Sequence, residues 1–194
     1  MSHVMIDLET LGTGSYAAIL SIGAVVFDPD TQSLGREFYA VVDPQSCVDH
    51  GLRIDVSTVM WWMKQGDVAR AALTVKGVPL PAALNGLAQW MPEAPEVWGN
   101  GATFDNVILS NAYKAIGVAQ PWKYYNDRCY RTLKNLFPNV PMPTFDGIAH
   151  RAIDDAKMQA RHANLILLHA SLAGAWKGAV GVGRDSPQVA TSGG

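Results

Sequence analysis

The sequence predicts an α/β fold in which helices flank a mixed β-sheet. Apolar, β-prone segments are concentrated before residue 43, whereas segments with helical periodicity dominate from about residue 57. One short strand among those helices adds the helix–strand alternation that is typical of a mixed sheet. The chain has 194 residues, of which 48% are hydrophobic and 16% charged, so it can bury one core and is not a disordered protein.

Three strands are expected in the first part of the chain. Residues 4–6 form a short β-prone run that leads into Asp7-Leu8-Glu9, and a turn at Gly12 and Gly14 follows. Residues 18–27 are apolar and β-branched, and residues 36–42 form the third strand. The short connection between these two segments, which contains Pro, Asp and Gly, predicts a hairpin.

Helices are expected in the rest of the chain, with one strand at residues 96–98. Asp127 is predicted to cap the start of the fourth helix. The predicted domain covers residues 1–173, because residues 174–194 are rich in Gly and Ser, have no apolar period and are expected to form a flexible tail. The predicted helices cover residues 57–63, 81–91, 104–116, 128–137 and 148–172.

Charge and cysteine content limit the classes of function. The formal net charge is −2, so any contact with nucleic acid must come from a local basic patch. Cys47 and Cys129 are too few for a disulfide framework and lack CxxC spacing, which favours the reducing cytoplasm. The longest apolar stretch, residues 17–27, is about half of what a membrane helix needs, and no membrane association or export signal is expected.

Asp7 and Glu9 are two residues apart on the first strand, so their side chains point to the same face. Two carboxylates on an otherwise apolar strand repel each other and lose hydration unless a cation lies between them. Hard oxygen ligands suit Mg²⁺ or Mn²⁺ rather than zinc. The alternative is a strand end whose acids reach solvent, and these two residues alone leave it open.

Two further acids and a histidine, which lie later in the chain, are candidates for the same site. Asp105 lies between the strand at 96–98 and the next helix, where ligands of α/β sheets gather; it can also serve only to stabilise the helix dipole. In the last helix, Asp155 flanks the apolar face, whereas Asp154 lies on the far side and is expected to be solvated. His150 stands about one turn before Asp155.

The order of these residues resembles the DnaQ-like 3′–5′ exonucleases, which are the histidine (DEDDh) subclass of four-acid nucleases. The resemblance extends over residues 4–171 and is nearest to the bacteriophage-type and exoribonuclease-like branch. Arg151 excludes the tyrosine form of the third motif, Tyr-x₃-Asp. The resemblance implies a ribonuclease H-like, mixed five-stranded sheet flanked by helices. It is carried by the segments 5–13, 61–65, 127–133 and 150–156.

The resemblance also implies a reaction. Asp7, Glu9, Asp105 and Asp155 would hold two divalent cations, Mg²⁺ or Mn²⁺, and His150 would be the general base. The expected activity is removal of nucleoside 5′-monophosphates from the 3′ ends of single-stranded nucleic acid, with DNA favoured. An exoribonuclease acting on RNA or short oligonucleotides is the first alternative. A nuclease-like module that only binds nucleic acid and a phosphatase for other substrates are the remaining ones.

Five residues are candidates for substrate contacts. Relatives place a backbone group and an apolar wedge against the terminal base at the positions of Thr10 and Leu11, although Leu11 can equally pack in the core. Trp61, one of two adjacent tryptophans, can stack on a base or form a subunit contact, so a homodimer is possible. Arg128 and Arg131 belong to a local basic cluster that can bind phosphates or simply be solvated.

Overall fold

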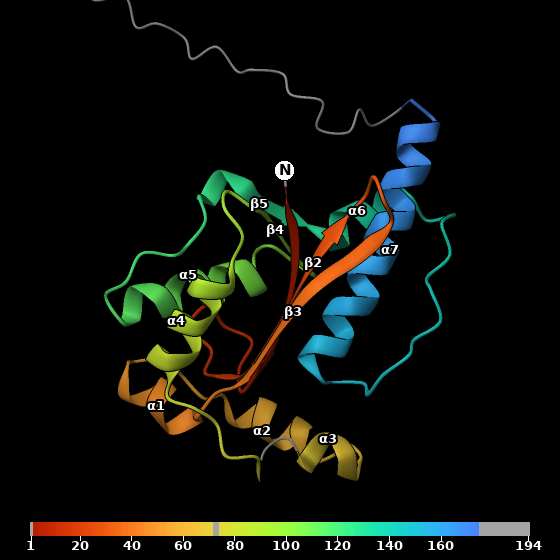
Figure 1. Ribbon diagram of the computed structural model, residues 1–194. Coiled ribbons are helices and arrows are strands. Elements are labelled where there is room, and N and C mark those ends of the chain that lie inside the picture. Colours follow the sequence, from red (N-terminus) through yellow and green to blue (C-terminus); the bar gives the residue numbers. More distant parts are fainter. Residues whose placement is uncertain (1, 72–73, 175–194) are drawn as a thin grey trace, which may run out of the picture.

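A mixed five-stranded sheet forms the centre of the molecule, with strand order β3-β2-β1-β4-β5. The computed structural model describes residues 2–71 and 74–174 (Figure 1). The first three strands form an antiparallel meander, and the last two run parallel to β1. This arrangement confirms the predicted fold class. The strands are β1 (His3–Thr10), β2 (Ile19–Asp28), β3 (Ser33–Val41), β4 (Glu96–Gly99) and β5 (Asp127–Cys129).

Helices cover both faces of the sheet. On one face α7 (Ala152–Leu172) packs across β1, β2 and β3 with α6 (Tyr130–Leu136) beside it, and on the other lie α4 (Leu80–Trp90) and α5 (Asp105–Ala115) (Figure 1). Three short helices lie at the end of the sheet where β1 finishes, opposite the 3₁₀ helix Tyr124–Asn126. They are α1 (Pro44–Asp49), α2 (Val56–Trp62) and α3 (Asp67–Ala71).

The alternation of β1 decides which face carries the acids. Val4, Ile6 and Leu8 are buried in the core beneath α4 and α5, whereas Met5 is buried in the core beneath α7. Because successive side chains of a strand point to opposite faces, Asp7 and Glu9 share the face of Met5. The two acids are therefore directed toward α7, which packs on this face through small side chains: Ala156, Ala160 and Ala163.

Gly23 on β2 allows the first turn of α7 to approach the sheet. It pairs directly with Asp7, and a Cβ atom added to it would lie 2.2 Å from the carbonyl carbon of Ala152. Any larger residue would push α7 away, since real Cβ atoms do not come that close to backbone atoms. The start of α7 is thus held next to Asp7.

Several predicted boundaries were wrong. The last helix begins at Ala152 rather than at residue 148, because His150 has a left-handed backbone (φ 64°) and Arg151 is extended. The helix predicted from residue 128 begins at Tyr130, because Asp127–Cys129 pairs with β4 as strand β5. The short helices α1 and α3, of six and five residues, lack the length for a periodic signal.

The remaining expectations concern the cysteines, membrane spans, cellular location and the C-terminal tail. Both cysteines are free thiols. Within residues 2–71 and 74–174, no helix has the length and apolar character needed to cross a membrane. The cytoplasmic location stays a prediction. The predicted flexible tail, from Gly174 onward, lies outside the described residues except for Gly174 itself.

Candidate active site

Three carboxylates meet at the end of β1. Asp7 and Glu9 come from β1 and Asp155 from the first turn of α7, and each contributes an oxygen that lies within 4.8 Å of the others. The structure therefore brings together acids that are separated by almost 150 positions in the chain. It does so because the alanine face of α7 packs closely on the sheet.

Asp105 joins this cluster from the first turn of α5. It is only 3% exposed, and its Oδ1 accepts a hydrogen bond of 3.2 Å from the backbone N–H of Leu8, which lies between Asp7 and Glu9. Gly99 at the end of β4 makes room for it, because an added Cβ would lie 2.9 Å from the Asp105 Cβ. All four predicted acids thus lie at one end of the sheet.

Burial and mutual repulsion make these acids hard to ionise. Burial, with the charges of Asp105, Glu9 and Asp155, raises the pKa of Asp7 well above its usual value. Burial and the neighbouring acids Asp155 and Asp105 raise the pKa of Glu9 to about 8. Burial likewise raises the pKa of Asp105 to about 7 and that of Asp155 above its usual value, although hydrogen bonds oppose both shifts.

These properties fit a site for divalent cations. Three carboxylates lie within 4.8 Å of one another and Asp105 lies beside them, and such hard oxygen donors are the ligand type that Mg²⁺ and Mn²⁺ prefer. A bound cation would relieve the repulsion that raises the pKa values, and the buried carboxylates would then be charged.

His150 lies beside Asp155 and two tryptophans. Its backbone N–H donates a hydrogen bond of 3.0 Å to Asp155 Oδ2, which helps to hold the left-handed conformation that non-glycine residues rarely adopt. The ring centroid of His150 lies 5.3 Å from that of Trp61 and 6.0 Å from that of Trp62, in both cases edge to face. The imidazole is thus held next to the acids by α2.

A cavity of about 440 Å³ opens next to Glu9. Trp62 is buried and its indole N–H donates to the Thr10 carbonyl at 2.9 Å, which fastens α2 to the end of β1. Trp61 is 44% exposed, so the two adjacent tryptophans do not share one environment. The lining residues are Leu8, Glu9, Thr10, Gly12, Thr13, Ser57, Thr58, Trp61, Trp62 and Phe104.

The structure places the residues predicted to contact substrate in different environments. Thr10 and Trp61 line the cavity, and Arg131 donates a hydrogen bond of 2.6 Å to the Asn100 carbonyl in the loop before Asp105. Leu11, in contrast, is 8% exposed and packs in the core beneath α4 and α5. The structure does not bring the Leu11 side chain to the cavity.

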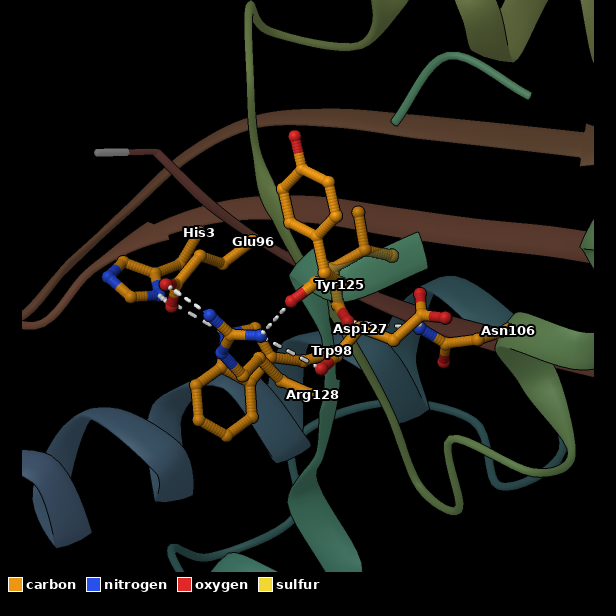
Figure 2. Close-up of polar contacts among 8 residues, drawn as sticks. His3, Glu96, Trp98, Asn106, Tyr125, Asp127 and Arg128 are labelled. Atoms are coloured by element: carbon orange, nitrogen blue, oxygen red, sulfur yellow. Dashed lines mark hydrogen bonds and ion pairs between the residues drawn. The ribbon is translucent and has the colours of Figure 1, made fainter. Parts of the chain in front are cut away.

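The side chain of Arg128 points away from the acids, toward the start of β4. Its guanidinium pairs with Glu96 Oε1 at 2.7 Å and donates to the carbonyls of Tyr125 and Asp127 (Figure 2). Glu96 pairs in register with His3, six residues before Glu9, which corresponds to about 20 Å along a strand. The structure thus directs the Arg128 side chain to the start of β4 rather than toward the acids, and a phosphate contact by Arg128 stays a prediction.

The structure contradicts two expectations about acidic residues outside the site. Asp127 does not cap a helix: its Oδ1 accepts hydrogen bonds of 2.8 Å from the side chains of Asn106 and Trp122 (Figure 2 shows the Asn106 contact). Asp154 is not a solvated charge, since its Oδ2 accepts from the Ile148 backbone N–H at 3.1 Å and its side chain is 11% exposed. Both acids hold loops in place.

Gln159 is a residue of the site that the sequence patterns did not indicate. Its Nε2 donates a hydrogen bond of 2.7 Å to Asp7 Oδ1. The available signal was its position four residues after Asp155, which places both side chains on one face of α7. The spacing alone does not show that this face of α7 packs against Asp7.

Comparison with known proteins agrees with this geometry. The family model described as the 3′-5′ exoribonuclease Rv2179c-like domain matches residues 2–167. The chain belongs to this Rv2179c-like family. It is therefore a 3′–5′ exonuclease of the DEDDh type, a hydrolase that acts on nucleic acid, and this type of enzyme depends on divalent metal ions.

Individual relatives of this Rv2179c-like exonuclease include one from a bacteriophage. The exodeoxyribonuclease of Enterobacteria phage T4 is 27% identical, with 80% of this chain and 84% of the relative covered. The nuclease domain of 3′hExo, a DEDDh member bound to rAMP, has a similar fold (TM-score 0.58, 16% identity, 90% and 93% covered). So does E. coli exonuclease I with a dT13 oligonucleotide (TM-score 0.63, 15% identity, 89% and 42% covered).

Proposed function

We propose that this exonuclease hydrolyses the last phosphodiester bond at the 3′ end of single-stranded DNA. Water attacks the phosphorus, the bond from phosphorus to the 3′ oxygen of the preceding nucleotide breaks, and a nucleoside 5′-monophosphate leaves. The shortened strand retains a new 3′-hydroxyl group. The observation that carries this proposal is the meeting of four acids and His150 next to a cavity of about 440 Å³.

The acidic cluster is the proposed metal site. Asp7, Glu9, Asp105 and Asp155 hold two divalent cations, Mg²⁺ or Mn²⁺. Such cations, when bound, would supply the positive charge that lowers repulsion between the phosphate and the nucleophile as the water loses its proton. His150 accepts a proton from that water, since an imidazole with a pKa near neutrality is suited to this role.

The cavity next to Glu9 is the proposed site of the terminal nucleotide. Trp61 offers an exposed aromatic face on which an unpaired base can stack, a contact worth roughly 1–3 kcal/mol. Thr10 contributes backbone contacts at the end of β1, and Leu11 supports that backbone from the core. Arg131, next to the loop that carries Asp105, contacts a phosphate.

DNA is the proposed backbone because the phage T4 relative, which aligns with most of the chain, is described as an exodeoxyribonuclease. RNA is the second candidate, because the family description names an exoribonuclease. The chemistry of the acids is the same for both, and contacts to the 2′-hydroxyl group decide between them.

The experiment uses 5′-labelled single strands of DNA and RNA with matched sequence, incubated with Mn²⁺, with Mg²⁺ and with chelator. A metal-dependent ladder that shortens from the 3′ end is expected, with DNA degraded faster. Faster loss of RNA would reverse the assignment of the substrate. Absence of cleavage of both strands, with binding retained, would contradict the proposed reaction.

A homodimer is the proposed assembly. Val56, Met60 and Met63, on and just after α2, are 77%, 53% and 54% exposed and offer an apolar surface beside the cavity. Light scattering coupled to gel filtration distinguishes a dimer from a monomer of 20.9 kDa. A mass that stays at the monomer value up to high concentration would refute the dimer.

A further inference from the structure

We propose that Gln159 is a positioning residue that holds the Asp7 carboxylate in the orientation required for metal binding. The inference rests on the proposed function, because it assigns Asp7 to the metal site. Gln159 lies on α7 one turn after Asp155, and its Nε2 donates to Asp7 Oδ1 at 2.7 Å. These two residues are 152 positions apart in the chain, so only the packing of α7 on β1 joins them.

The surroundings of Gln159 indicate that its amide group serves the hydrogen bond to Asp7. The side chain is 3% exposed and lies between the alanines of α7 that face the sheet. Its Oε1 accepts no hydrogen bond from any residue within the described ranges. A buried amide with an unpaired oxygen is costly, and an apolar side chain of the same size would avoid that cost. The hydrogen bond to Asp7 is the one polar contact that explains a glutamine here.

The chemistry of an amide suits a metal-binding carboxylate. A donor on Oδ1 fixes the rotation of the Asp7 side chain and leaves Oδ2 free of this contact. It also favours the charged form of the carboxylate, which is the form that binds a cation. A lysine or arginine at this position would add a positive charge next to the cations, whereas the neutral amide does not.

The position of Gln159 also couples two ligands. Asp155 and Gln159 project from the same face of one helix, and that helix begins against Gly23, the pairing partner of Asp7. The helix therefore sets the Asp155 carboxylate and the orientation of Asp7 together. Movement of α7 would disturb both at once.

The test replaces the amide by an apolar group of similar length, Gln159→Met. Calorimetric titration with Mn²⁺ is expected to show binding that is about 10- to 100-fold weaker, the usual effect of losing a group that orients a metal ligand. In activity assays, the Mn²⁺ concentration for half-maximal rate rises by a similar factor, whereas the KM for a DNA strand at saturating Mn²⁺ stays the same. A merely structural role would lower the melting temperature without this change in Mn²⁺ affinity.

The matched control is Asn164→Leu, a buried polar residue of the same helix whose side chain bonds to the Ser33 carbonyl instead of to the site. It is expected to leave Mn²⁺ affinity unchanged. If Gln159→Met does not fold, Gln159→Leu repeats the test with a different shape. Unchanged Mn²⁺ affinity in a folded variant at position 159 would overturn the positioning role alone. Lack of both Mn²⁺ binding and cleavage in the wild-type protein would overturn the proposed function instead.

Discussion

The two ends of β1 differ in whether their charged side chains are paired with opposite charges. At its start, Arg128 and Glu96 form an ion pair of 2.7 Å, and the indole N–H of Trp98 donates to His3 Nδ1 at 3.1 Å (Figure 2). At its end, Asp7 and Glu9 meet the buried Asp105 and the half-buried Asp155. One end is neutralised by its own residues, whereas the other needs a cation from outside.

The pKa shifts of His3 and Glu9 reflect the same difference between the two ends of β1. Burial lowers the pKa of His3 and so favours the neutral ring, although the nearby Glu96 carboxylate opposes this shift. Burial and the neighbouring carboxylates raise the pKa of Glu9 to about 8. The start of β1 is thus arranged for stability, and its end keeps an unfavourable arrangement of charge that is typical of functional sites.

Removal of one acid has the largest expected effect. Asp7→Asn deletes a charge from the crowded end, so activity is expected to fall by about 10³-fold or more, equivalent to about 4 kcal/mol of transition-state stabilisation. The melting temperature in chelator is expected to stay the same or rise, because repulsion is relieved. Rate assays with Mn²⁺ and thermal unfolding in chelator measure the two effects. A clearly lower melting temperature would mean that Asp7 stabilises the fold.

Crowding of the space between β2 and α7 has the next largest effect. Gly23→Ala places a methyl group against the Ala152 backbone and displaces Asp155, and a shift of about 1 Å in a catalytic group costs about 10²-fold in rate. Overpacking also lowers the free energy of unfolding by about 1–3 kcal/mol. Gly66→Ala, whose methyl group would meet open space, is the control. Equal activity of both variants would show that Gly23 does not set the geometry of the site.

The two ends of β1 are expected to respond to pH with opposite sign. The lowered pKa of His3 makes the fold more stable as pH rises to about 6.5. The acids have folded-state pKa values above their unfolded ones, so their contribution is present at low pH and is lost as pH rises through about 7 for Asp105 and about 8 for Glu9.

The measurement follows from that sign. In chelator, the melting temperature is expected to fall by about 4 °C or more between about pH 6.5 and about pH 8.5, which corresponds to at least about 1 kcal/mol. Saturating Mn²⁺ removes most of this decrease, and Glu9→Gln reduces it. A melting temperature that stays constant or rises over this range in chelator would contradict the charge assignment of the acidic end.

A matched pair of arginine variants gives the smallest effect and the sharpest comparison. Arg128→Met breaks the ion pair with Glu96, so the melting temperature is expected to fall by about 2–4 °C while activity changes by less than about twofold. Arg131→Met is expected to raise the KM for DNA by about 5- to 10-fold, equivalent to about 1 kcal/mol, with little change in stability. A larger increase in KM for Arg128→Met than for Arg131→Met would indicate that Arg128 contacts the substrate.

Local periodicity was sufficient for much of the fold and for the main acids. Strand alternation predicted that Asp7 and Glu9 share a face, and helical periodicity predicted that Asp155 flanks the apolar face of the last helix; both hold in the structure. These predictions succeed because the spacing of side chains along a strand or helix is set by backbone geometry, which nearby residues determine.

The three-dimensional structure alone decided which faces meet and how closely. Asp127 matched a capping pattern, yet pairing with β4 made it part of a strand, and the same strand turned Arg128 away from the acids. The contact of Gln159 with Asp7 depends on the approach of α7 that Gly23 permits. Backbone geometry sets the direction of a side chain, but the packing of distant elements determines which residues it contacts.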